Sequence, residues 1–79
     1  MTDLFLQGDL LGYPAETYKP ERWYMVLDEG VSIYESLPRR LAVFDFTNNR
    51  KVEVYYITVS QWLQADKCKL VRDGKEVSW

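Results

Sequence analysis

Basic and aromatic side chains recur together in this sequence, and these residue types are well suited to binding another macromolecule. Arg39-Arg40 and Arg50-Lys51 flank a segment that contains Phe44 and Phe46. Aromatic rings and arginine dominate the binding energy of many protein–protein interfaces. Rings interleaved with basic groups can also stack on single-stranded nucleic acid and neutralise it. The structural alternative is that the rings form the core while the charges protect the edge of a sheet.

The chain has more aromatic residues than one small core encloses, so some rings are expected at the surface. Its 79 residues include three tryptophans, six tyrosines and three phenylalanines, and a domain of this size buries only part of its surface. We predict that partner-binding residues lie among these rings and the arginines near them. The candidates are Trp23, Tyr24, Tyr34, Arg39, Arg40, Tyr55 and Trp62.

Groups that catalyse reactions are scarce. The chain has no histidine, which excludes Ser-His-Asp and Cys-His mechanisms and removes the commonest metal ligand. Without that activator, Cys68 is interpreted as a small buried apolar residue, with a redox-sensing thiol as the alternative. Asp28-Glu29 is the only pair of adjacent acids, it falls in a predicted turn, and no phosphate-binding glycine loop is present. We predict a protein that is not an enzyme and has neither a metal site nor a cofactor.

The charge of the chain gives little support to nucleic-acid binding. The formal net charge is −2 and the pI about 5.0, whereas nucleic-acid-binding modules usually have a basic excess. Residues 1–36 hold seven acids and two bases, net −5, and residues 37–79 hold five acids and eight bases, net +3. Such an asymmetry can steer a charged partner.

Cysteine content and hydropathy bear on the compartment. The single cysteine cannot form an internal disulfide, the chain opens without a signal-like pattern, and no apolar run approaches membrane-spanning length. We predict a cytoplasmic protein with no membrane partner.

The segment from Leu41 to Val59 predicts a β-hairpin at the middle of a sheet. Both arms are rich in β-branched and aromatic residues, and Asn48-Asn49 suits a two-residue loop. The predicted pairs are Thr47–Arg50, Val43–Val54 and Leu41–Tyr56. This register places Leu41 and Val43 on the core face, which only Asp45 interrupts.

Shorter elements are predicted before this hairpin. The apolar clusters at 4–6 and 10–11 predict either two short strands or a strand and a loop, and Gly8 argues against a helix there. A loop at 13–21 that contains two prolines follows. Arg22 to Asp28 has the composition of a strand, and Val31 to Ser36 is its predicted partner across a turn at Asp28-Glu29-Gly30.

After the central hairpin, Ser60 to Ala65 predicts a helical turn with Ser60 as its N-cap. Asp73-Gly74 predicts the turn of a last hairpin, residues 67–79, which pairs Leu70 with Val77 and Cys68 with Trp79. Its outer face is basic, with Lys67, Lys69, Arg72 and Lys75. A short helix followed by such a hairpin resembles the recognition helix and wing of winged-helix proteins over about a quarter of the chain, which implies nucleic-acid binding.

Together these elements predict one small, mainly β domain spanning residues 1–79. Six or seven short strands form an antiparallel sheet curled into a barrel or sandwich, with one short helical turn near residues 60–66. Size and strand count are similar to those of SH3-like and OB-like barrels, a similarity that carries no function.

The function we predict is that of a small non-catalytic protein-interaction module: an accessory subunit, an assembly factor, a regulator or an inhibitor of a larger complex. The alternative is a nucleic-acid-binding barrel or winged domain that uses Arg39, Arg40, Arg50, Lys51 and the basic C-terminal hairpin. A third possibility is a homo-oligomer formed through an open sheet edge.

Overall fold

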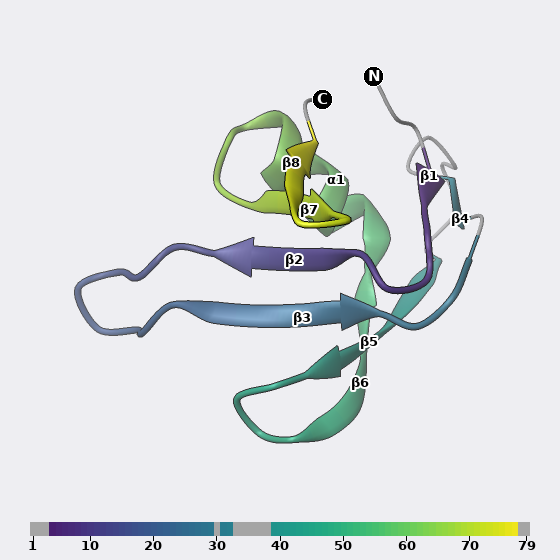
Figure 1. Cartoon of the computed structure of the whole chain (residues 1–79). Helices are drawn as coiled ribbons and strands as arrows, with labels where there is room; N and C mark the ends of the chain where they lie inside the picture. Colours follow the sequence, from purple (N-terminus) through teal and green to yellow (C-terminus); the bar gives the residue numbers. More distant parts are fainter. Residues whose placement is uncertain (1–3, 30, 33–38, 78–79) are drawn as a thin grey trace.

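The computed structural model describes residues 4–29, 31–32 and 39–77, which form eight strands and one helix (Figure 1). In chain order the elements are β1 (Leu4–Phe5), β2 (Leu10–Tyr13), β3 (Arg22–Val26), β4 (Val31–Ser32), β5 (Arg40–Asp45), β6 (Arg50–Tyr55), α1 (Tyr56–Gln64), β7 (Lys69–Arg72) and β8 (Lys75–Val77).

Six of these strands form one antiparallel sheet in the order β6-β5-β3-β2-β7-β8, and β1 pairs with β4. Strands β2 and β3 run through its middle, between the hairpin β5–β6 and the hairpin β7–β8 (Figure 1). The predicted mainly β fold, with an antiparallel sheet and one short helix, is confirmed. Within the described residues the sheet does not close into a barrel, and β6 and β8 form its edges.

The hydrophobic core lies on one face of this sheet. Side chains alternate between the two faces along a strand, so each strand gives the core only every second residue. Helix α1 packs against that face with residues spaced three or four apart, and β1 adds Phe5. The core residues, none more than 5% exposed, are Phe5, Leu11, Val26, Leu41, Val43, Tyr56, Val59, Leu63, Cys68 and Leu70.

The central hairpin is present, but its loop and register differ from the prediction. Strand β5 ends at Asp45 and β6 begins at Arg50, so the loop is residues 46–49 rather than Asn48-Asn49 alone. The observed pairs are Asp45–Arg50, Val43–Val52 and Leu41–Val54. The predicted partners of Val43 and Leu41 were therefore wrong by two residues. A shift of two residues keeps every side chain on its predicted face, and for this reason Leu41 and Val43 are still buried.

Asp45 accounts for the longer loop. Its carboxylate accepts hydrogen bonds from the backbone N–H groups of Thr47 (2.9 Å) and Asn48 (3.3 Å) and from Nδ2 of Asn48 (2.8 Å). Asn49 then adopts a left-handed backbone with φ 53°, which asparagine tolerates. Because the carboxylate satisfies donors inside the loop, the four-residue connection is stabilised and the tighter two-residue loop does not form.

The helix is longer than predicted and begins earlier. The residues 56–59, which were predicted to continue the hairpin strand, form the first turn of α1. Ser60 is not the N-cap, because it lies inside the helix, where its Oγ donates a hydrogen bond to the carbonyl of Ile57 (2.9 Å). The helix ends in a Schellman motif: Asp66 has φ 59°, its N–H bonds the carbonyl of Leu63, and the N–H of Lys67 bonds that of Trp62.

Other predicted strands have mixed outcomes. The C-terminal hairpin is confirmed: Leu70 lies opposite Val77, and Asp73 and Gly74 form the turn with φ 54° and 77°. The short strands near residues 4–6 and 10–11 are present as β1 and β2, and 14–21 is a loop whose only pairing is an isolated bridge between Glu16 and Lys19.

The predicted hairpin between Arg22–Asp28 and Val31–Ser36 is wrong in its described part. Val31–Ser32 pairs with β1, whereas β3 pairs with β2 and β5. A strand with apolar residues on both faces is suited to the interior of a sheet, and β3 already has two neighbours there. Residues 33–36 and Trp79, the predicted partner of Cys68, lie outside the described residues.

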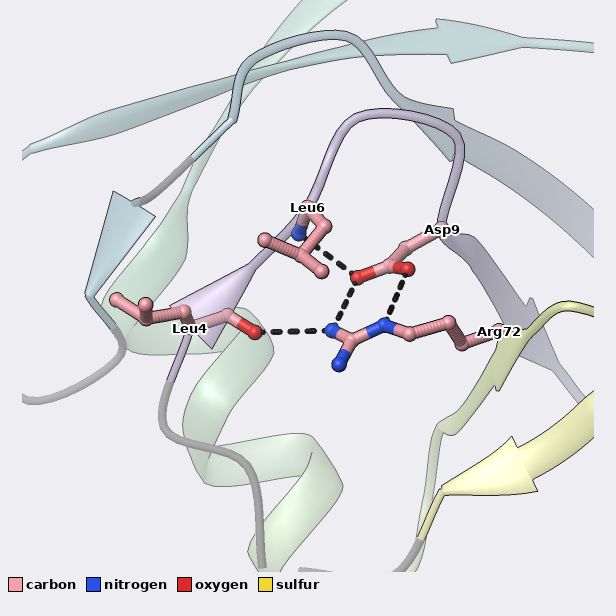
Figure 2. Close-up of polar contacts among 4 residues, drawn as sticks. All are labelled: Leu4, Leu6, Asp9 and Arg72. Carbon is pink, nitrogen blue, oxygen red and sulfur yellow. Dashed lines mark hydrogen bonds and ion pairs between the residues drawn. The ribbon is translucent and has the colours of Figure 1, made fainter.

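A buried ion pair joins the two ends of the described chain. Asp9, 2% exposed, lies in the loop between β1 and β2, and Arg72 ends β7. Figure 2 shows the guanidinium facing both carboxylate oxygens, with Nε bonding Oδ1 (2.8 Å) and Nη2 bonding Oδ2 (2.7 Å). The same Oδ2 accepts the N–H of Leu6 (2.8 Å), and Nη2 also donates to the carbonyl of Leu4 (3.1 Å). This network fixes the N-terminal loop against the C-terminal hairpin.

The Asp9–Arg72 pair yields the first prediction. In Asp9→Asn an amide replaces one acceptor oxygen and leaves the guanidinium without its countercharge. Removing one partner of a buried pair costs about 3–5 kcal/mol. Because the Arg72 side chain is 21% exposed, we expect a loss of roughly 2–4 kcal/mol in the free energy of unfolding.

Urea denaturation followed by tryptophan fluorescence measures this loss. The exposed Asp28→Asn is the matched control, because it removes the same charge from a residue at the surface. Equal stability of the two variants would contradict the proposed role of the ion pair.

The second prediction concerns pH. The hydrogen bond from the Asn48 side chain is the largest influence on the pKa of Asp45, which lies below its usual value; the two backbone N–H groups and Arg50 act in the same direction, and burial opposes them. Since the folded pKa is below the unfolded value of about 3.9, the carboxylate stabilises the fold above that pH. This stabilisation is lost as the pH falls through the folded pKa.

Asp45→Asn removes this charge, so its penalty in unfolding free energy should be constant near neutral pH and shrink below about pH 4. Urea unfolding of both proteins over that range provides the measurement. A penalty that does not change on acidification would show that the charge of Asp45 is not what stabilises the loop.

Candidate partner-binding surfaces

The face of the sheet opposite the core is largely apolar. The strand register places one row of side chains across all six strands, because residues directly opposite each other point to the same face. This row consists of Glu76, Val71, Leu10, Met25, Phe44 and Lys51. Trp23, two residues before Met25, belongs to the same face, and Phe46 lies beside Phe44 with their ring centroids 5.3 Å apart. We call this surface the open face; its apolar centre is Leu10, Trp23, Met25, Phe44, Phe46 and Val71.

Exposure distinguishes the open face from the core face. Leu10, Trp23, Met25, Phe44 and Val71 are half-buried and Phe46 is 50% exposed. Helix α1 and Phe5 of β1 pack with the core cluster on the opposite side. Contiguous apolar surface of this kind marks an interaction site more often than scattered exposed residues do.

The Trp23 ring lies close over its cross-strand partner, which is a glycine. Gly12 pairs with Trp23 in the β2–β3 ladder. A Cβ at position 12 would come within 2.6 Å of the Trp23 ring. The indole Nε1 donates a hydrogen bond to the carboxylate of Glu21. The ring therefore covers the backbone of β2 and buries Gly12.

Charges of both signs border the open face. The central row has Glu76 at one end and Lys51 at the other, and Lys69 and Glu53 occupy the same face by strand alternation. Arg40 and Tyr55 are paired at the far end of the β5–β6 ladder. The Arg40 guanidinium lies 5.8 Å from the Tyr55 ring centroid and 3.9 Å from the Glu53 carboxylate. The border is close to neutral, which suits a partner with mixed surface charge.

The core face has a second surface feature where α1 leaves part of the sheet uncovered. A cavity of about 280 Å³ lies there, and three of its lining rings come from Tyr13, Tyr24 and Trp62. The Tyr13 ring centroid is 5.5 Å from that of Tyr24 and 5.6 Å from that of Trp62. Arg22, which pairs with Tyr13 across β2–β3, places its guanidinium 5.4 Å from the Tyr13 centroid. We call this feature the aromatic pocket.

The structure separates the residues that the sequence proposed as one set. Trp23, Arg40 and Tyr55 lie on the open face, whereas Tyr24 and Trp62 line the aromatic pocket. Arg39 is exposed just before β5, and Tyr34 lies outside the described residues. Sequence reasoning missed Leu10, Met25 and Val71 on the open face, and Tyr13 and Arg22 in the pocket. The sequence did contain a signal for the open face, because apolar residues fill both faces of residues 23–27. That pattern was interpreted as a strand covered on both faces, whereas the described part of the structure covers one.

The remaining candidates for chemistry have simple environments. Cys68 is 3% exposed, and burial raises the pKa of its thiol to about 11, so it remains a thiol at neutral pH. Asp28 and Glu29 are exposed. Among the described residues, no three His, Cys, Asp or Glu side chains cluster as metal ligands would, and the one helix is too short and too polar to cross a bilayer.

Comparisons with models of protein families, with curated proteins and with solved structures found no match to this chain.

The contact between Gly12 and Trp23 yields the third prediction. In Gly12→Ala the new methyl group displaces the Trp23 ring, because ring atoms lie 2.6, 2.7 and 3.0 Å from its position. Overpacking of this kind costs roughly 1–3 kcal/mol. We expect that loss, together with a shift of the Trp23 indole N–H signal in NMR spectra.

Gly8→Ala is the matched control. Gly8 has φ +92° and open space around its Cβ position, so alanine there introduces backbone strain without touching Trp23. If both variants moved the Trp23 signal equally, or neither did, the ring would not depend on the glycine.

Proposed function

We propose that this chain is a small non-catalytic protein-interaction module that binds another protein through the open face. The observation that carries the proposal is the row Val71, Leu10, Met25 and Phe44, which is apolar and only half-buried in the interior of the sheet, with Trp23 beside it. Apolar side chains in the interior of a sheet are normally shielded from water by a second layer that packs on them. An accessory subunit, an assembly factor or an inhibitor gains that cover from its target.

The chemistry of the border supports a protein as the occupant. Lys51 and Glu76 end the central row with opposite charges, and Arg40 is close to Glu53. A mixed border complements a protein surface, which also has both signs, and it lacks the single-sign field that a polyanion requires.

Nucleic-acid binding, the alternative prediction, has weaker support. Arg72 of the basic C-terminal hairpin is held by Asp9, and Arg50 and Lys51 are consecutive in β6, so they point to opposite faces. Binding of single-stranded DNA that weakens steeply with salt and with Arg39→Ala plus Arg40→Ala would favour this alternative.

The fourth prediction tests the open face by crosslinking. In the native host, a photoreactive benzophenone amino acid is introduced at one of two positions. The first variant replaces Phe44, on the open face, and the control variant replaces Tyr18, which is 95% exposed in the β2–β3 loop. We expect a specific crosslink to another protein from position 44 and none from position 18. The captured protein is then purified and its affinity for the unlabelled chain is measured.

Met25→Glu should weaken that affinity at least about a hundredfold, because it places an unpaired carboxylate in the apolar centre of the contact. Gln64→Glu, which adds the same charge on the exposed part of α1, should leave the affinity unchanged. The proposal fails if position 44 yields no specific product, if Gln64→Glu weakens binding equally, or if position 44 crosslinks only to a second copy and sedimentation shows a dimer that Met25→Glu dissociates.

A further inference from the structure

The aromatic pocket contains a cation without a counterion. Arg22 and Lys19 both line it, and none of its lining residues is acidic. Among the described residues Arg22 makes no ion pair, and its Nε is buried without a hydrogen-bond acceptor. The guanidinium is held instead by the neighbouring ring of Tyr13. A buried donor without a partner destabilises the fold, and an anion beside the guanidinium would offset part of that cost.

Two carboxylates near this group line a different cavity. Glu16 and Asp66 line an adjoining hollow with Arg22 and Lys67, and no ion pair joins either acid to Arg22. The positive charge of the pocket is therefore not neutralised from the side of the loop or from the end of the helix. This uncompensated positive charge gives the pocket a preference for an anionic ligand.

The walls of the pocket add a preference for a ring. Tyr13, Tyr24 and Trp62 surround the cavity from two strands and the helix, and Thr58 adds a hydroxyl group. Burial is the main influence that raises the pKa of the Tyr13 phenol well above its usual range, and its hydrogen bond with Cys68 acts in the same direction, so the phenol stays neutral and adds no negative charge to the pocket. The volume, about 280 Å³, is just below the range of drug-sized ligand sites, about 300–1,000 Å³, and so suits a ligand no larger than a single ring with a small substituent.

We propose that the aromatic pocket is a binding site for a small ligand that consists of one aromatic ring bearing an anionic group. The ring stacks among Tyr13, Tyr24 and Trp62, while the carboxylate or phosphate binds Arg22, with Lys19 at the same wall. Arginine suits this role because its planar guanidinium binds both types of anion with paired hydrogen bonds. The site lies on the opposite face from the proposed protein-binding surface and does not depend on it.

The fifth prediction is tested by NMR titration of the full chain with four probes. Benzoate and phenyl phosphate have the ring and the charge, benzyl alcohol has only the ring, and acetate has only the charge. We expect the Trp62 indole N–H signal to shift with benzoate or phenyl phosphate and to saturate below about 10 mM, ten times the Kd of a ligand bound with about 4 kcal/mol. The Trp23 signal, on the open face, should not move. The tighter of the two ring anions identifies the ligand as a carboxylate or a phosphate ester.

Arg22→Gln should weaken binding at least tenfold, since a hydrogen bond to a charged group contributes about 1.5–3 kcal/mol. Arg50→Gln, at the exposed start of β6, is the matched control and should bind as the unchanged chain does. Thr58→Trp, which fills the cavity from an exposed helix position, should abolish binding even if Arg22→Gln does not fold. Equal shifts with benzyl alcohol and benzoate, no shift with any ring anion, or equal losses in both arginine variants would overturn the proposal.

Discussion

Helix α1, the one helix of the described residues, is too small to cover the sheet that it packs against, and the surface chemistry of this protein follows from that mismatch. Helix α1 has nine residues and is therefore about 14 Å long and about 10 Å wide. Six strands spaced about 4.8 Å apart span roughly 24 Å across the sheet. One such helix shields part of one face. The aromatic pocket lies where its cover ends on the core face, and the open face receives nothing from it.

So small a core also needs support from outside the helix–sheet contact. The Asp9–Arg72 network supplies it, because residues 63 positions apart in the sequence are joined by two short charge-assisted hydrogen bonds. Both oxygens of Asp9 are used, and the guanidinium also holds the carbonyl of Leu4. The loop before β2 is thereby fixed to the hairpin that follows α1, and the ends of a short chain become one structural unit. A basic residue that had looked like part of a nucleic-acid-binding stripe is instead a structural residue.

The sequence predicts those parts of the fold in which one local signal dominates. Asp73-Gly74 determines both the turn and the register of the last hairpin. Both residues have positive φ, as a two-residue hairpin loop requires, and a loop of that length allows only one alignment of the two strands. The central hairpin contains two signals: Asn48-Asn49 favours a tight loop, but Asp45 satisfies donors inside a longer one, and the longer loop forms. The first turn of the helix was missed because Ile57, Thr58 and Val59 favour strands. The spacing of Tyr56, Val59, Ser60 and Leu63, which are the buried residues of α1, is nevertheless that of a helix face.

The candidate binding residues were harder to predict, because which surface a side chain joins depends on the strand register. Trp23 and Tyr24 are consecutive, so they had been considered as parts of one surface. In β3 they point to opposite faces, and each joins a surface of different chemistry. Arg22 and Tyr24 contribute to a concave site with uncompensated positive charge, whereas Trp23 and Met25 contribute to a broad apolar site with a balanced border. One strand thus supplies a pocket of small-molecule size and a surface suited to a macromolecule. Because the alternation is strict, a substitution at Met25 alters one surface and leaves the side chains of the other in place.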